Sequence, residues 1–304
     1  MWTKPWSMKE GFLIGGGIII AGLMLELSVG PVIWEAFSWP ANVIVLAFFL
    51  LIIALMYLLR QKAYAVGFFY SLQAAIPALC YAVALTIIMG LTRQTVNGTW
   101  INNMLTFWPF VLIYAYIGLI LGMVVLHQLK TWVKTGFSRS ALPYSVLFHL
   151  GLFIAMTTAT LGNADMQRVK MITAIGEPEW RALDQQGHIK EMPLAIELKQ
   201  FIMDTYDDGS PRRFASVIQI LTPDGKNIQT TVDVNNPAEV NGWKIYQYGY
   251  DTQMGAKSNT SILELVSDPW LPIVYTGIGM MLLGALCMMF MGRKKGSKTS
   301  IQTT

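Results

Sequence analysis

Three histidines carry the side chains best suited to proton or metal chemistry near neutral pH. His149 lies inside a long apolar stretch, His127 lies at the end of another, and His188 follows Gln186-Gly187 in a polar string typical of a turn. An imidazole within hydrocarbon must find a partner, because an unpaired polar group is costly there. His149 could therefore ligate iron, carry protons or donate a hydrogen bond to a neighbouring helix. His127 can reach interfacial water beside Lys130, and we expect His188 on a solvated surface.

Other residue types offer little chemistry. The sequence contains no GxSxG, P-loop or HExxH motif, so it predicts no catalytic residue. Cys80 and Cys287 lie far apart in apolar stretches, and we expect two small buried hydrophobes without redox function. Glu26 lies near the end of the first apolar stretch, where we expect it to reach headgroup water. Buried polar residues are too few to favour a transporter.

The composition indicates which elements must position these histidines. Of 304 residues, 54% are hydrophobic and 13% are charged, whereas soluble proteins carry about 25% charged residues. This excludes an ordinary water-soluble enzyme. A helix of about 20 apolar residues crosses a bilayer, and six such stretches occur, at about 11–33, 40–60, 67–91, 106–128, 142–162 and 270–291. The sequence therefore predicts an integral membrane α-helical bundle with six transmembrane helices.

The basic residues predict the orientation of these helices. Twelve Lys and Arg residues lie outside 163–268, and with six alternating helices eleven of them fall on one side. Only Arg93 falls on the other. The positive-inside rule then places both termini in the cytoplasm. Because the net charge of +4 is segregated in this way, it reflects topology and no nucleic-acid partner is expected.

The segment 163–268 differs from the rest because it is rich in charge and contains no long apolar run. Alternation over 214–221, a turn at 223–226 and a second alternating run at 228–234 predict a β-hairpin. Further strands are expected at 243–250 and 261–266. The domains are thus a five-helix membrane region (1–162), an inserted extracytoplasmic β-rich domain (163–268), and a last helix with a basic cytoplasmic tail (269–304).

One strand of this domain is unusually aromatic, and it allows two interpretations. Alternation sends Trp243 and Ile245 to one face and Tyr246 to the other. The strand could simply pack one face into a core, as aromatic residues favour strands. It could instead present an edge or face to a partner. The candidate partner-binding residues are Trp243, Tyr246, Gln247 and Tyr250.

Four strings occur in a recognisable order. They are Phe148-His149-Leu150-Gly151-Leu152-Phe153, Val234-Asn235-Asn236-Pro237, Gly242-Trp243-Lys244-Ile245-Tyr246-Gln247 and Asp268-Pro269-Trp270-Leu271-Pro272. In this order and topology, the chain resembles ResB (also called CcsB) over roughly residues 67–291. ResB-like proteins belong to the system II machinery of cytochrome c biogenesis.

This resemblance implies a multi-pass protein of the bacterial plasma (inner) membrane with a CcsA-type membrane partner. The complex moves haem outward and supports its attachment to apocytochrome c, so haem is ligand or cargo. His149 matches the family's membrane histidine, which implies that it ligates the haem iron, and His127 is a second candidate haem-binding residue. Besides CcsA, apocytochrome c and membrane lipid are the implied partners. The resemblance also implies that the chain is an accessory subunit of a cytochrome c synthetase complex, and we expect no independent enzyme activity.

The sequence departs from the family pattern in two respects. Family members commonly have four helices, whereas six are predicted here, and the tryptophan-rich WGxxWxWD segment that marks CcsA is missing from the sequence. A separate subunit should therefore supply the second haem pocket. The alternative function is a membrane-anchored scaffold or sensor whose outer domain binds protein.

Overall fold

The computed structural model describes residues 2–95, 98–134, 142–208 and 210–291. It divides into two compact units. The first consists of Met1–Ala164 and Trp270–Thr304, and the second of Asp165–Pro269. Arg139 and the basic tail predicted after residue 291 lie outside the described residues.

The first unit is helical, and its described residues contain six helices long and apolar enough to cross a membrane. The six predicted helices are therefore confirmed, and a short helix α3 (Tyr64–Phe68) separates the second from the third. The first helix ends earlier than predicted, because the chain leaves it at Gly30 with a positive φ of 83°. The long helices are α1 (Met8–Val29), α2 (Ala41–Leu59), α4 (Leu72–Leu91), α5 (Trp108–Lys134), α6 (Leu142–Gly162) and α7 (Leu271–Met291).

The starts of these helices have clear local causes. Ser7 and Glu10 form a reciprocal capping box at the start of α1, in which the Ser7 backbone N–H donates to Glu10 Oε2 at 2.7 Å. Pro109, Pro143 and Pro272 each lie in the first turn of α5, α6 or α7. Proline suits this position because its missing N–H has no partner within the helix anyway.

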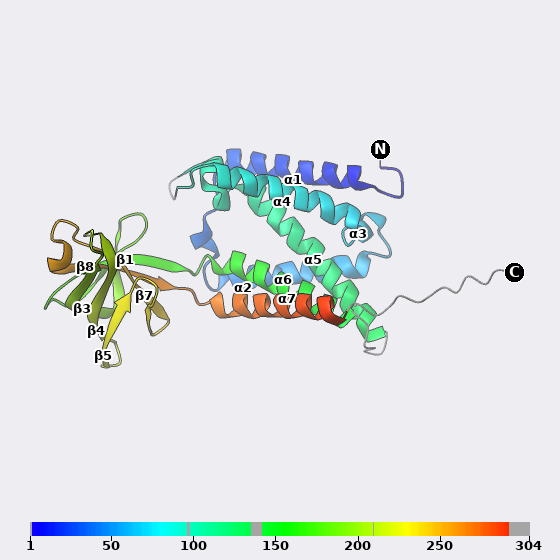
Figure 1. The fold of residues 1–304 in the computed structure, drawn as a ribbon. Coiled ribbons are helices and arrows are strands. Elements are labelled where there is room, and N and C mark those ends of the chain that lie inside the picture. The colour runs from blue at the N-terminus through cyan, green and yellow to red at the C-terminus, as the bar shows by residue number, and fades with distance from the viewer. Residues whose placement is uncertain (1, 96–97, 135–141, 209, 292–304) are drawn as a thin grey trace. The chain divides into compact units, whose positions relative to one another are not determined.

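Helix α5 is the central helix of this unit. It contacts α1 and α4 on one side and α2 and α6 on another, and Figure 1 shows it crossing between these two groups. Helix α7 packs along α6 through glycine. A Cβ added at Gly277 would lie 2.6 Å from the backbone N of Ala155 and 2.7 Å from the carbonyl oxygen of Gly151. Such small residues let two helix backbones approach closely.

Most of the remaining helix surface is apolar and not covered by protein. Leu58, Leu91 and Phe290 are 70%, 83% and 73% exposed. Continuous exposed apolar surface of this extent is rare on water-soluble monomers. It is the distribution expected for helices surrounded by lipid.

The second unit is an antiparallel sheet of eight strands in the order β5-β4-β3-β2-β1-β8-β7-β6. The predicted β-rich domain is thus confirmed, including the hairpin, which is formed by β4 and β5. Half of the strands were not predicted: β1, β2, β3 and β6. The bounds are β1 (Gln167–Ala174), β2 (Glu179–Leu183), β3 (Ile189–Thr205), β4 (Pro211–Leu221), β5 (Asn227–Asp233), β6 (Ala238–Val240), β7 (Trp243–Tyr250) and β8 (Thr260–Ser267).

This sheet curls so that its two halves face each other. Strands β4 and β8 are four positions apart in the sheet, roughly 19 Å if it were flat, yet the Ser216 hydroxyl on β4 lies 2.8 Å from the Ser261 hydroxyl on β8. Likewise, the rings of Phe201 on β3 and Tyr250 on β7 stack with centroids 5.1 Å apart. The enclosed core is dominated by aliphatic side chains such as Ile218, which is fully buried.

Candidate functional site

His149 lies on α6 and is held by the turn that precedes it. Its Nδ1 lies 2.7 Å from the backbone carbonyl oxygen of Ser145, one helical turn earlier. A carbonyl oxygen only accepts hydrogen bonds, so Nδ1 carries the proton and donates. In a neutral ring Nε2 is then unprotonated and has a free lone pair. Among the residues the structure describes, no hydrogen bond reaches Nε2.

Gln128 on α5 joins this arrangement from the neighbouring helix. Its amide nitrogen donates to Ser145 Oγ at 3.1 Å and lies 3.4 Å from His149 Nδ1. The amide oxygen of Gln128 is buried without a partner within the described part of the chain. The three residues therefore form a polar cluster between α5 and α6 that holds two unused acceptor atoms, one of them the imidazole Nε2.

This donor set fits a metal-ligating imidazole. Histidine ligands in proteins usually donate their second ring N–H to a carbonyl or carboxylate, which fixes the tautomer and the ring orientation. The Ser145 carbonyl occupies that role for His149. No group of three or more His, Cys, Asp or Glu that could hold a metal occurs within the described ranges.

His127 is not brought together with His149. Although it precedes Gln128 directly, it is exposed, and its ring stacks on Tyr70 with centroids 4.9 Å apart. Successive residues of an α-helix differ by about 100° in direction, so His127 points in a different direction from Gln128, the residue of α5 that meets His149. The haem-binding role of His127 stays a prediction, and its observed partners are those of a separate cluster.

Two predictions of side-chain exposure are wrong, one for Glu26 and one for the two cysteines. Glu26 is only 6% exposed, and its Oε2 accepts a hydrogen bond from the backbone N–H of Trp108 at 3.2 Å. A carboxylate at this position satisfies a free N–H at the start of α5 and interacts favourably with the helix dipole. Cys80 is exposed and Cys287 is half-buried, because both lie on helices whose outer surface no other helix covers.

In the aromatic strand β7, buried and more exposed side chains alternate as predicted. Two of the four candidate partner-binding residues are buried, so fewer of them lie on the surface. Trp243 and Gln247 are 7% and 3% exposed and point into the domain. Gln247 Nε2 donates to Ser261 Oγ at 2.9 Å, which explains why this polar side chain can be buried. A surface partner can therefore reach only Tyr246 and Tyr250 of the four candidates, and this role stays a prediction.

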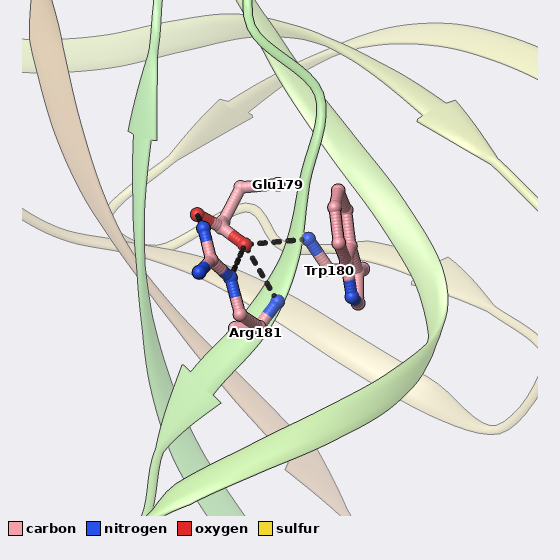
Figure 2. Close-up of polar contacts among 3 residues, drawn as sticks. All are labelled: Glu179, Trp180 and Arg181. Atoms are coloured by element: carbon pink, nitrogen blue, oxygen red, sulfur yellow. Dashed lines mark hydrogen bonds and ion pairs between the residues drawn. The ribbon is translucent and has the colours of Figure 1, made fainter.

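Sequence reasoning missed an exposed tryptophan in β2. Figure 2 shows the Glu179 carboxylate, whose Oε1 accepts from the backbone N–H groups of Trp180 and Arg181 at 3.0 and 2.9 Å. The same carboxylate accepts two side-chain hydrogen bonds from Arg181. This pairing lowers the pKa of Glu179 to about 2, with the side-chain hydrogen bond from Arg181 as the main cause. Trp180 remains 48% exposed, and the bulge at this point carried no sequence signal.

The fold and the site define a class of protein: an apolar helical bundle with a polar cluster of His149, Ser145 and Gln128, and an inserted antiparallel β-domain. Residues 134–261, which include His149, match the model of a family described as the ResB-like family. The chain is ResB/CcsB-like in sequence.

Curated relatives agree with this match over about a third of the chain. A cytochrome c biogenesis protein CcsB of Prochlorococcus marinus (strain NATL1A) is 28% identical over 102 residues, which is 34% of this chain and 23% of the relative. The protein NrfI of Wolinella succinogenes is 31% identical over 97 residues, 31% of this chain and 10% of the relative. The aligned segment thus spans about a quarter or less of these relatives.

Among solved structures, the cytochrome c haem lyase CcmF aligns with 95% of this chain and 46% of its own length. The sequence identity is 12% and the TM-score is 0.41. These values do not establish a shared fold.

Proposed function

We propose that the chain is a subunit of a cytochrome c biogenesis complex of the system II type, which handles or exports haem and supports its attachment to apocytochrome c. The observation that supports this is the ResB-like segment 134–261 together with the imidazole it contains, His149, whose Nδ1 is already engaged by Ser145. The chain acts with a CcsA-type membrane partner and has no independent catalytic activity.

His149 is the residue that holds haem in this proposal. Haem iron is commonly bound by imidazole, and the free Nε2 of His149 is the atom suited to it. Haem is the group that is delivered, and residues of this chain position it. Ser145 fixes the ring, and Gln128 offers a buried amide oxygen beside it.

The proposed orientation places six helices across the bacterial plasma membrane, both termini in the cytoplasm and the β-domain outside. The exposed apolar helix surface and the one-sided distribution of Lys and Arg support it. A reporter that is active only outside the cytoplasm should be active when fused after Asp165 and silent after Lys295. Reporter activity at both positions would contradict this topology.

A visible spectrum tests the haem role. We expect the chain, purified in detergent with its CcsA-type partner, to show a haem absorption band, and the His149→Gly variant to lose most of it at equal protein level. Ser145→Ala is a comparison variant: it removes the hydroxyl that Gln128 bonds but keeps the carbonyl that holds Nδ1, so it should retain more haem than His149→Gly. A spectrum without haem for the unmodified complex would instead favour the second function.

That second function is a membrane-anchored scaffold whose outer domain binds protein. The exposed Trp180, held in place by Glu179 and Arg181, favours it, because tryptophan and arginine are enriched where proteins bind tightly. Trp180→Ala should then abolish co-purification of a partner while the helices stay inserted.

A further inference from the structure

A cluster of cationic and phenolic side chains lies where α2 and α5 end. It comprises Tyr57 of α2, Arg60 directly after α2, His127 and Lys130 of α5, and Tyr70 just before α4, and is called the Tyr57 cluster below. The Arg60 guanidinium carbon lies 3.6 Å from the centre of the Tyr57 ring, and the Lys130 ammonium lies 6.0 Å from it. Two cations therefore converge on one aromatic ring.

The third basic group of the cluster is His127. Its ring stacks on Tyr70 at 4.9 Å and interacts electrostatically with both Arg60 and Lys130. Three groups that can carry positive charge are thus close together. Like charges at close range repel each other unless an anion lies between them.

The chain itself does not supply that anion in the part that the structure describes. Neither Arg60 nor Lys130 forms an ion pair with a described Asp or Glu, whereas Arg213 in the β-domain contacts two aspartates. Arg60 uses one N–H to reach the carbonyl oxygen of Tyr57. A guanidinium has five such donors, so several remain available for a ligand.

The Tyr57 hydroxyl provides a second, independent sign of a missing partner. Tyr57 is only 8% exposed, and its hydroxyl oxygen has no hydrogen-bond partner among the described residues. Buried hydroxyls are nearly always paired, because leaving one unpaired costs stability. An acceptor that reached this hydroxyl would also be attracted by the two cations beside the ring.

We propose that the Tyr57 cluster binds the phosphate of an anionic phospholipid from the leaflet at this end of the helices. Leu58 and Leu59, which precede Arg60, are 70% and 47% exposed and can contact the acyl chains of the same lipid. Basic pockets between helices at the cytoplasmic surface are suited to such headgroups. The inference rests on the proposed membrane insertion and is independent of the haem role.

Native mass spectrometry of the full chain in detergent tests this proposal. The probes are phosphatidylglycerol and phosphatidylcholine with the same acyl chains. We expect the unmodified chain to retain phosphatidylglycerol in preference to phosphatidylcholine. The double variant Arg60→Gln/Lys130→Gln should weaken that binding by roughly fivefold for each cation removed. Tyr57→Phe, which keeps the ring for Arg60, should weaken it less.

The matched control is Lys4→Gln/Lys9→Gln, which removes two cations from the same predicted side but outside the cluster. It should bind phosphatidylglycerol as the unmodified chain does. Equal loss in both double variants would overturn the proposal, because the attraction would then come from net charge alone. Displacement of the lipid by inorganic phosphate would also overturn it, since the site would be one for free phosphate. Haem content is not measured, so the outcome does not depend on the haem role.

Discussion

The Nδ1 atom of His149 lies 2.7 Å from the backbone carbonyl oxygen of Ser145. This i to i−4 contact uses a carbonyl that already belongs to helix α6, so no second helix is needed to fix the tautomer. The tautomer in which Nε2 carries no proton therefore follows from α6 itself. What the neighbouring helix α5 adds is Gln128, which bonds the Ser145 hydroxyl.

Replacing His149 with glycine should lower the haem that co-purifies with the complex by at least roughly tenfold, because the iron loses a ligand. Free imidazole in the growth medium should restore part of it, since the small ligand fits the vacated space and coordinates the same iron. His127→Ala should have a smaller effect. Haem content is measured from the visible spectrum at equal protein level. Normal haem and normal cytochrome assembly in the glycine variant would leave His149 as a hydrogen-bonded structural residue.

Gln128 should act as a positioning residue for His149. Gln128→Leu keeps the volume but removes the amide, and we expect haem retention to fall by roughly tenfold, the lower range for loss of a group that orients a metal ligand. The position of the haem absorption bands should also shift, because the ring is less firmly oriented. Gln128→Glu, which keeps an acceptor beside the imidazole, should retain more haem. An unchanged spectrum in the leucine variant would contradict this role.

The close packing of α6 and α7 should depend on Gly277. In Gly277→Ala the new Cβ would lie 2.6 Å from the backbone N of Ala155, where no flexible side chain can move away. We expect a loss of about 1–3 kcal/mol in stability, typical of overpacking. Gly279→Ala is the control, because nothing lies within 4 Å of its Cβ. Thermal unfolding in detergent measures both, and equal midpoints would show that the helices separate freely.

The helices could be predicted from the sequence because their signal is local. Each needs only about 20 apolar residues and a break, and prolines such as Pro143 mark several starts. The position of Glu26 could not be predicted, because its partner Trp108 is 82 residues away and meets it only after α1 and α5 pack. The same holds for the candidate site: His149 was singled out by its setting, whereas Gln128 becomes relevant only through contacts between two helices.

The predicted strands are those in which alternation involves large aliphatic or aromatic residues. In β1 the inward residues are Val169, Met171 and Thr173, and the outward residues include Lys170 and the apolar, exposed Ile172. Methionine and threonine gave too weak a contrast for a strand to be assigned. In β4 the inward Ile218 and Ile220 made the pattern plain. The long strand β3 was missed, although Leu194, Ile196 and Leu198 alternate within it.

The pairing of Glu179 with Arg181 predicts how the stability of the β2 region depends on pH. The folded-state pKa of Glu179 is about 2, below its ordinary value of 4.5. A lowered carboxyl pKa stabilises the fold above the ordinary value, and this stabilisation is lost as the pH falls from 4.5 towards 2. Because the Arg181 side chain is 56% exposed, water screens the pair and the contribution should be below about 1 kcal/mol.

Hydrogen exchange of the β2 and β3 amides in the full chain measures this contribution. At pH 6, Glu179→Gln should exchange faster than the unmodified chain, because the neutral amide binds Arg181 less strongly. The difference between the two should shrink as the pH falls below 4.5 and vanish only below the folded-state pKa of about 2, where the carboxyl is protonated in the folded chain as well. Lys226→Gln, which removes a cation from a distant turn, is the control and should leave β2 unchanged. A difference that stays constant down to pH 2 would mean that Glu179 acts through its shape and backbone hydrogen bonds, and that its charge contributes nothing.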